Sequence, residues 1–88
     1  MEVVWSLHSR KRFFERALLY GLNEGEVEAH IIKQEVKQKQ ENGAIKTIFS
    51  VMNQRFTVIK EETKEWICVI SIWESNDKEI ELWLRKKK

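Results

Sequence analysis

The apolar positions at the start of the chain change from a short run to a helical spacing. Val3-Val4-Trp5 predicts a strand within residues 1–5, and a helix is predicted from about Leu7 to Tyr20. Ser6 stands where an N-cap is needed, and Gly21 stands where a helix commonly ends. One side of this helix carries its aromatic residues: Phe13, Phe14 and Tyr20. We therefore expect that side to face the core.

A second helix is predicted to begin at Asn23, which acts as an N-cap with Glu26 as its capping-box partner. Its end is open to two interpretations. The helix could run on to the Asn42-Gly43 pair, or it could stop near Lys33 and leave residues 36–40 as an edge strand. The early end is the one favoured here.

The second half of the chain has the alternation of β-strands. Strands are predicted at Ile45–Met52 and Arg55–Lys60, followed by a polar hairpin loop at residues 61–64. Trp66–Trp73 is apolar on both faces, which predicts the central strand of the sheet. Residues 78–85 fit a strand and a helix equally well.

The order of these elements predicts a single α+β domain over residues 1–88. An N-terminal strand and two helices precede an antiparallel sheet of three or four strands. The 88 residues are 42% hydrophobic, enough to exclude general disorder, and 34% charged. The net charge is only +2, so any claim of nucleic-acid binding must depend on local clustering of cations, such as the basic tail at 85–88.

Cysteine and hydropathy restrict the class of protein further. Cys68 is the only cysteine, so the chain can form no internal disulfide and has no cysteine-rich zinc site. Pairing His8 with His30 would leave a metal without a third ligand at recognisable spacing, and His30 is interpreted as structural. We predict no metal, no cofactor and no membrane segment, and expect a cytoplasmic protein.

The first predicted helix carries a cationic side. His8, Arg12 and Arg16 recur at every fourth position and therefore share one side, with Arg10 and Lys11 close by. Arginine can hold phosphate oxygens in bidentate fashion but does not exchange protons near neutral pH. His8 is the only group of this set suited to proton transfer. The helix N-terminus and the neighbouring cations disfavour its charged form, which suits a base or a neutral hydrogen-bond donor.

These features resemble a family of small prokaryotic domains of unknown function. Its members open with a Ser-x-His-x-x-x-Arg-x-x-x-Arg helix, matched here by Ser6, His8, Arg12 and Arg16. An acidic start of a second helix and paired strands follow in the same order, and the resemblance covers roughly residues 3 to 75. The sequence departs from the pattern where residues 17–20 separate the second arginine from glycine.

The family is similar to RelE/ParE/BrnT-like toxins, many of which are endoribonucleases. The resemblance implies an RNA-binding, toxin-like protein that cleaves RNA without metal and is covered by a cognate antitoxin. In this interpretation His8, Arg12 and Arg16 are catalytic. The RNA-binding residues are then a further set of cations: Arg10, Lys11, Arg55 and Lys60.

Two other interpretations fit the same residues. The domain could be a non-catalytic interaction module, including a homodimer, in which the arginines form an ordinary solvated face. It could also bind nucleic acid without cleaving it. Trp66 and Trp73 bracket the predicted central strand and are expected in the core, whereas Trp5 and Trp83 could pack, form a dimer contact or stack on bases.

Overall fold

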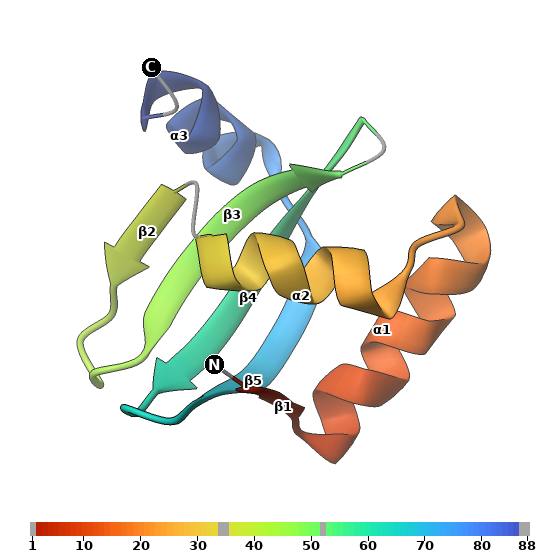
Figure 1. Cartoon of the computed structure of the whole chain (residues 1–88). Helices are drawn as coiled ribbons and strands as arrows, with labels where there is room; N and C mark the ends of the chain where they lie inside the picture. Colours follow the sequence, from red (N-terminus) through yellow and green to blue (C-terminus); the bar gives the residue numbers. More distant parts are fainter. Residues whose placement is uncertain (1, 34–35, 52, 87–88) are drawn as a thin grey trace.

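The protein is an α+β domain with a five-stranded mixed sheet and helices on both faces (Figure 1). The structure, a computed structural model, describes residues 2–33, 36–51 and 53–86. The elements in chain order are β1 (Glu2–Trp5), α1 (Leu7–Tyr20), α2 (Glu24–Lys33), β2 (Val36–Lys39), β3 (Ile45–Val51), β4 (Gln54–Glu62), β5 (Trp66–Glu74) and α3 (Asp77–Lys86). The α+β prediction is confirmed, although the sheet has five strands rather than three or four.

The sheet has the order β1-β5-β4-β3-β2. β2, β3, β4 and β5 pair antiparallel, while β1 runs parallel to β5 and joins Trp5 to Val69 in register. β4 is therefore the middle strand, and the prediction that Trp66–Trp73 is central is wrong by one position. β1 forms one edge of the sheet, beside β5. α1 and α2 then carry the chain across one face of the sheet to β2, which forms the opposite edge.

The predicted helix boundaries follow from local capping. The Ser6 hydroxyl accepts the Ser9 N–H at 3.1 Å, and the Asn23 side chain accepts the Glu26 N–H at 3.1 Å. Gly21 ends α1 with a φ of 65°, a conformation that glycine adopts without a steric penalty. The early end of the second helix is confirmed, since β2 follows as an edge strand.

Residues 78–85, which fitted two patterns, form part of α3. Some predicted positions lie outside the described residues: Met1, Met52, Lys87 and Lys88.

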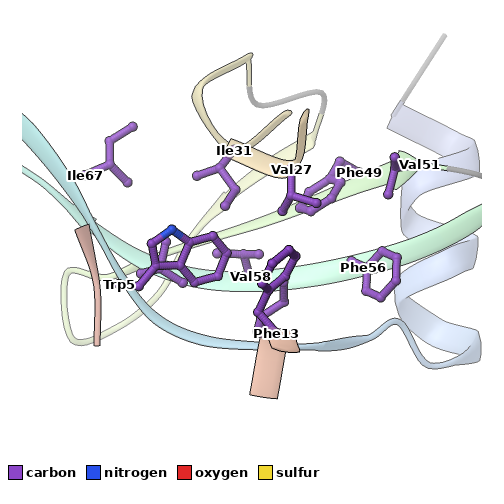
Figure 2. Packing of buried hydrophobic residues seen from close by; sticks show 11 residues of the cluster. Trp5, Phe13, Val27, Ile31, Phe49, Val51, Phe56, Val58 and Ile67 are labelled. Carbon is purple, nitrogen blue, oxygen red and sulfur yellow. The ribbon is translucent and has the colours of Figure 1, made fainter. Parts of the chain in front are cut away.

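The main core lies between the sheet and the layer formed by α1 and α2. Eleven buried apolar residues form it, and Figure 2 shows Phe13 pointing from α1 into their midst. They are Trp5, Phe13, Val27, Ile31, Phe49, Val51, Phe56, Val58, Ile67, Val69 and Ile72. A smaller cluster of Val36, Ile48 and Trp83 attaches α3 to the opposite face of the sheet. His30 stacks on Phe49 at 5.5 Å, consistent with the structural role expected for it.

The tryptophans are distributed differently from the prediction. Trp5 and Trp83 are buried, whereas Trp66 is 45% exposed and Trp73 is partly buried. The expectation that Trp66 lies in the core is therefore wrong. Its neighbour Ile67 points into the main core, so alternation along β5 turns Trp66 towards the other face of the sheet.

Candidate nucleic-acid interface on helix α1

Two serines fix the start of α1 to β5. The Ser6 N–H donates to the Val69 carbonyl at 3.0 Å, and the Ser9 hydroxyl donates to the same carbonyl at 2.9 Å. The Ser6 hydroxyl also lies 3.2 Å from the Ile70 carbonyl. Ser9 is fully buried, although no structural role was predicted for it from the sequence. The signal was its position one turn before Phe13, on the side of the helix that faces the core.

This attachment leaves the other side of α1 in solvent. His8, Lys11 and Arg12 are exposed. Within the described part of the chain, no ion pair or side-chain hydrogen bond involves any of the three. Their charged and polar groups are therefore available to an external anion.

Arg16 differs from the other members of the predicted catalytic set. Its Nε lies 3.4 Å from a Glu74 carboxylate oxygen, and its side chain is about two-thirds buried. The Tyr20 hydroxyl donates to the second Glu74 oxygen at 2.7 Å. That hydrogen bond, together with burial, raises the pKa of Tyr20 above its usual value of 10.0. Arg16 thus has a partner on β5, whereas His8 and Arg12 do not.

An apolar patch lies beside the cations of α1. Phe14 is 50% exposed and Leu7 is 88% exposed, and both line a shallow depression with Arg10, Lys11 and Glu15. The expectation that Phe14 faces the core is wrong, since Phe13 fills that position instead. His8 and Arg12 do not line the depression. Arg10 is held by an ion pair to Glu24 at 3.4 Å, with both side chains partly exposed.

Arg55 does not lie on the same surface as α1. It belongs to β4 and lies on the face covered by α3, with its guanidinium carbon 5.0 Å from the centre of the Trp83 ring. Such a cation–π contact is a packing arrangement that also restrains the side chain. The sheet therefore separates Arg55 from His8 and Arg12.

Lys60 is fully buried, which contradicts its predicted role in binding RNA. Its ammonium group donates to the Ile31 carbonyl at 3.0 Å and to a Glu62 carboxylate oxygen at 3.1 Å. Burial lowers the pKa of Lys60 below its usual 10.5, although the Glu62 carboxylate opposes the change. The side chain closes the space between α2 and the sheet and is not accessible to a phosphate.

Lys60→Met is expected to lose more stability relative to the wild type as the pH rises. Between the lowered folded pKa and 10.5, the unfolded wild type holds more protons than the folded wild type, so its free energy of unfolding increases with pH. The variant lacks that contribution. Urea denaturation of both proteins at neutral pH and at about pH 10 measures the difference. Lys64→Met, at an exposed turn position, should show no such trend; a constant difference for Lys60→Met would contradict the argument.

The described residues contain no group of three or more His, Cys, Asp or Glu side chains that could hold a metal ion. None of the described helices is long and apolar enough to cross a membrane.

Comparison with family models, curated proteins and solved structures found no match. The resemblance of the first helix to a toxin-like family therefore stays a prediction. The geometry itself provides an exposed aromatic ring, Phe14, in a shallow depression that Arg10 and Lys11 also line. An exposed aromatic ring beside cationic side chains is the combination that proteins use to bind single-stranded nucleic acids.

Proposed function

We propose that the protein binds single-stranded RNA through the exposed side of α1. The observation that carries the proposal is the half-exposed Phe14 ring in a depression lined by Arg10 and Lys11. An exposed aromatic ring offers a stacking surface to any base, and adjacent cations neutralise the phosphates on either side of it. Arg12, which lies outside the depression, adds a further exposed cation that forms no ion pair with any described residue.

Arg16 can join this surface at low cost. Its ion pair with Glu74 is partly exposed, and pairs of this kind contribute roughly 0–1 kcal/mol to stability. A phosphate can therefore compete for the guanidinium. Arg10 and Glu24 are also partly exposed, so a phosphate can compete for the Arg10 guanidinium in the same way.

Phe14→Ala is expected to weaken RNA binding by roughly 5- to 100-fold, which corresponds to the loss of one stacked base. Lys11→Gln should instead flatten the dependence of log K on log salt by about 0.7, because one phosphate contact is lost. Fluorescence anisotropy with a labelled oligouridylate at several salt concentrations measures both quantities. Lys64→Gln is the matched control, because Lys64 is exposed on the β4–β5 turn. Equal affinities for Phe14→Ala and Lys64→Gln would reject α1 as the RNA site.

Cleavage is a further step of the same proposal. His8 would act as the proton-transfer group, and Arg12 and Arg16 would hold the phosphate that is attacked. Incubation with RNA in EDTA should give products with the wild type and none with His8→Ala, while both bind RNA. If both bind and neither cleaves, the protein is an RNA-binding protein without nuclease activity. A cognate antitoxin, which the resemblance implies, is proposed only if the protein cleaves RNA.

The exposed apolar side chains favour a second candidate function, which is binding of another protein. Leu7 and Phe14 could bury apolar surface against a partner helix that carries acidic residues for Lys11 and Arg12. This alternative predicts no measurable affinity for oligouridylate at low salt. The anisotropy experiment therefore distinguishes the two functions.

A further inference from the structure

The face of the sheet that carries α3 is covered at one end only. α3 lies over the end where β5 finishes (Figure 1). It is held there by contacts of Glu79 with Trp73 and Lys46 and of Trp83 with Arg55. Trp66 lies seven residues before Trp73, roughly 20 Å away along an extended strand. At that end no described helix covers this face.

Apolar side chains form the uncovered end of this face. Four of them, which we name the open floor, are Val4, Ile59, Trp66 and Cys68. The register joins Val4 to Cys68, and alternation with the buried Ile67 and Lys60 turns all four away from the main core. Val4 is 41% exposed and Trp66 is 45% exposed. Val4, Trp66 and Cys68 are neighbours on this face, whereas Ile59 pairs with Ser71 further along the sheet. Exposed apolar side chains gathered in this way are typical of an interaction site.

Carboxylates lie beside the open floor at three positions. Glu2 is paired with Trp66, and Glu61 is paired with Cys68, so both exposed acids lie on the same face as the floor. Glu41 lines a depression that also contains Ile59. A partner that binds the open floor therefore needs an apolar contact surface with cationic groups around it, opposite these carboxylates.

The last turn of α3 has this chemistry. Leu84 is 53% exposed, and Arg85 and Lys86 follow it in solvent. Among the described residues, neither Arg85 nor Lys86 is part of an ion pair. The chain thus presents an apolar residue with two cations at one end of this face and an acid-rimmed apolar floor at the other.

We propose that the open floor is occupied by α3 of a second copy, in a reciprocal two-fold dimer. Because α3 covers only one end of this face, that end stands higher than the open floor by about the diameter of a helix, roughly 10 Å. When two such faces are related by a two-fold axis, each α3 covers the floor of the other copy. Leu84 then meets the apolar floor, and Arg85 comes near Glu61. Because each open floor and each α3 has one partner in such a dimer, the assembly is closed and does not extend to further copies.

Charge argues against the simpler arrangement in which the two floors stack directly on each other. That arrangement would bring Glu2 and Glu61 of both copies together, and like charges at an interface are costly. The reciprocal arrangement instead brings the basic last turn of α3, with Arg85 and Lys86, to the carboxylates of the other copy. It also leaves α1 of both copies exposed, because α1 lies on the other face of the sheet (Figure 1).

Charge reversal tests the reciprocal contact. Sedimentation equilibrium of the wild type at about 100 μM chain should detect a dimer. Glu61→Lys and Arg85→Glu should each weaken dimerisation by about tenfold or more, since each places like charges together twice. An equimolar mixture of the two variants should dimerise again, because in the mixed dimer both contacts pair opposite charges. Both substituted positions are exposed, and circular dichroism checks that each variant is folded.

The outcomes separate the possibilities. Restoration in the mixture supports the reciprocal dimer. A wild type that is monomeric at this concentration overturns the proposal, as does a dimer that neither variant weakens. Loss of dimerisation without restoration in the mixture overturns the assigned contact between Glu61 and Arg85. None of these results depends on RNA binding.

Discussion

Phe13→Ala is expected to lower the free energy of unfolding by about 3–5 kcal/mol, the usual cost of removing a buried phenylalanine. Phe13 is 2% exposed and lies at the centre of the main core, with its ring 5.0 Å from that of Trp5 (Figure 2). Removal of the ring leaves a cavity between α1 and the sheet. Native domains are stable by only about 5–15 kcal/mol, so the variant should keep a small part of its stability.

Phe14→Ala provides a matched control at the next residue. Phe14 is 50% exposed, so its removal should cost less than about 1 kcal/mol. In thermal denaturation followed by circular dichroism, Phe13→Ala should lower the midpoint by roughly 15–30 °C and Phe14→Ala by a few degrees. Equal effects of the two substitutions would mean that α1 is rotated relative to the core. The pair also links stability to function, because only Phe14→Ala should weaken RNA binding in a protein that remains folded.

Glu79→Ala is expected to have the second largest effect, a loss of about 2–4 kcal/mol. Glu79 is 4% exposed, and its carboxylate accepts three hydrogen bonds. The donors are the Trp73 indole N–H at 3.0 Å, the Asn76 backbone N–H at 2.9 Å and the Lys46 ammonium group at 2.8 Å. Asn76 accepts the Glu79 N–H in return, which completes a capping box at the start of α3. Truncation leaves these donors without a partner where α3 meets the sheet.

Glu81→Ala is the control for this prediction. Glu81 is exposed on the same helix, so its loss should change the free energy of unfolding by only a few tenths of a kcal/mol. Urea denaturation at neutral pH compares the two variants. A loss below about 1 kcal/mol for Glu79→Ala would show that the network contributes little to holding α3.

The same carboxylate gives a prediction on pH. Burial by itself would raise the pKa of Glu79, but the hydrogen bonds from Lys46, Asn76 and Trp73 outweigh it and hold the pKa below its usual 4.5. Between the folded pKa and 4.5 the unfolded chain binds more protons, so this contribution to stability is lost as the pH falls. The difference between wild type and Glu79→Gln should therefore narrow below about pH 4.5. A difference that stays constant under acid conditions would contradict the cause assigned to the lowered pKa.

The sequence by itself determined the features that depend on neighbouring residues. Ser6, Asn23 and Gly21 mark helix ends because capping needs only groups within one turn of the chain. The α+β class followed from the change of hydrophobic spacing after about residue 36. The exposure of His8 and Arg12 followed from their place on α1, opposite a stripe of residues that faces the core.

Tertiary structure alone decided the partners that are distant in the sequence. Arg16 forms an ion pair with Glu74 at the end of β5. The Lys60 ammonium group donates to the Ile31 carbonyl near the end of α2. No local pattern distinguishes such a buried lysine from an exposed one in a polar strand. Trp66 is exposed because α3 ends over the opposite end of the sheet, a consequence of how far the last helix reaches. Local hydrogen bonding depends on residues within a short stretch of the sequence, so the sequence predicts it. Burial depends on how elements far apart in the chain pack together, so only the tertiary structure decides it.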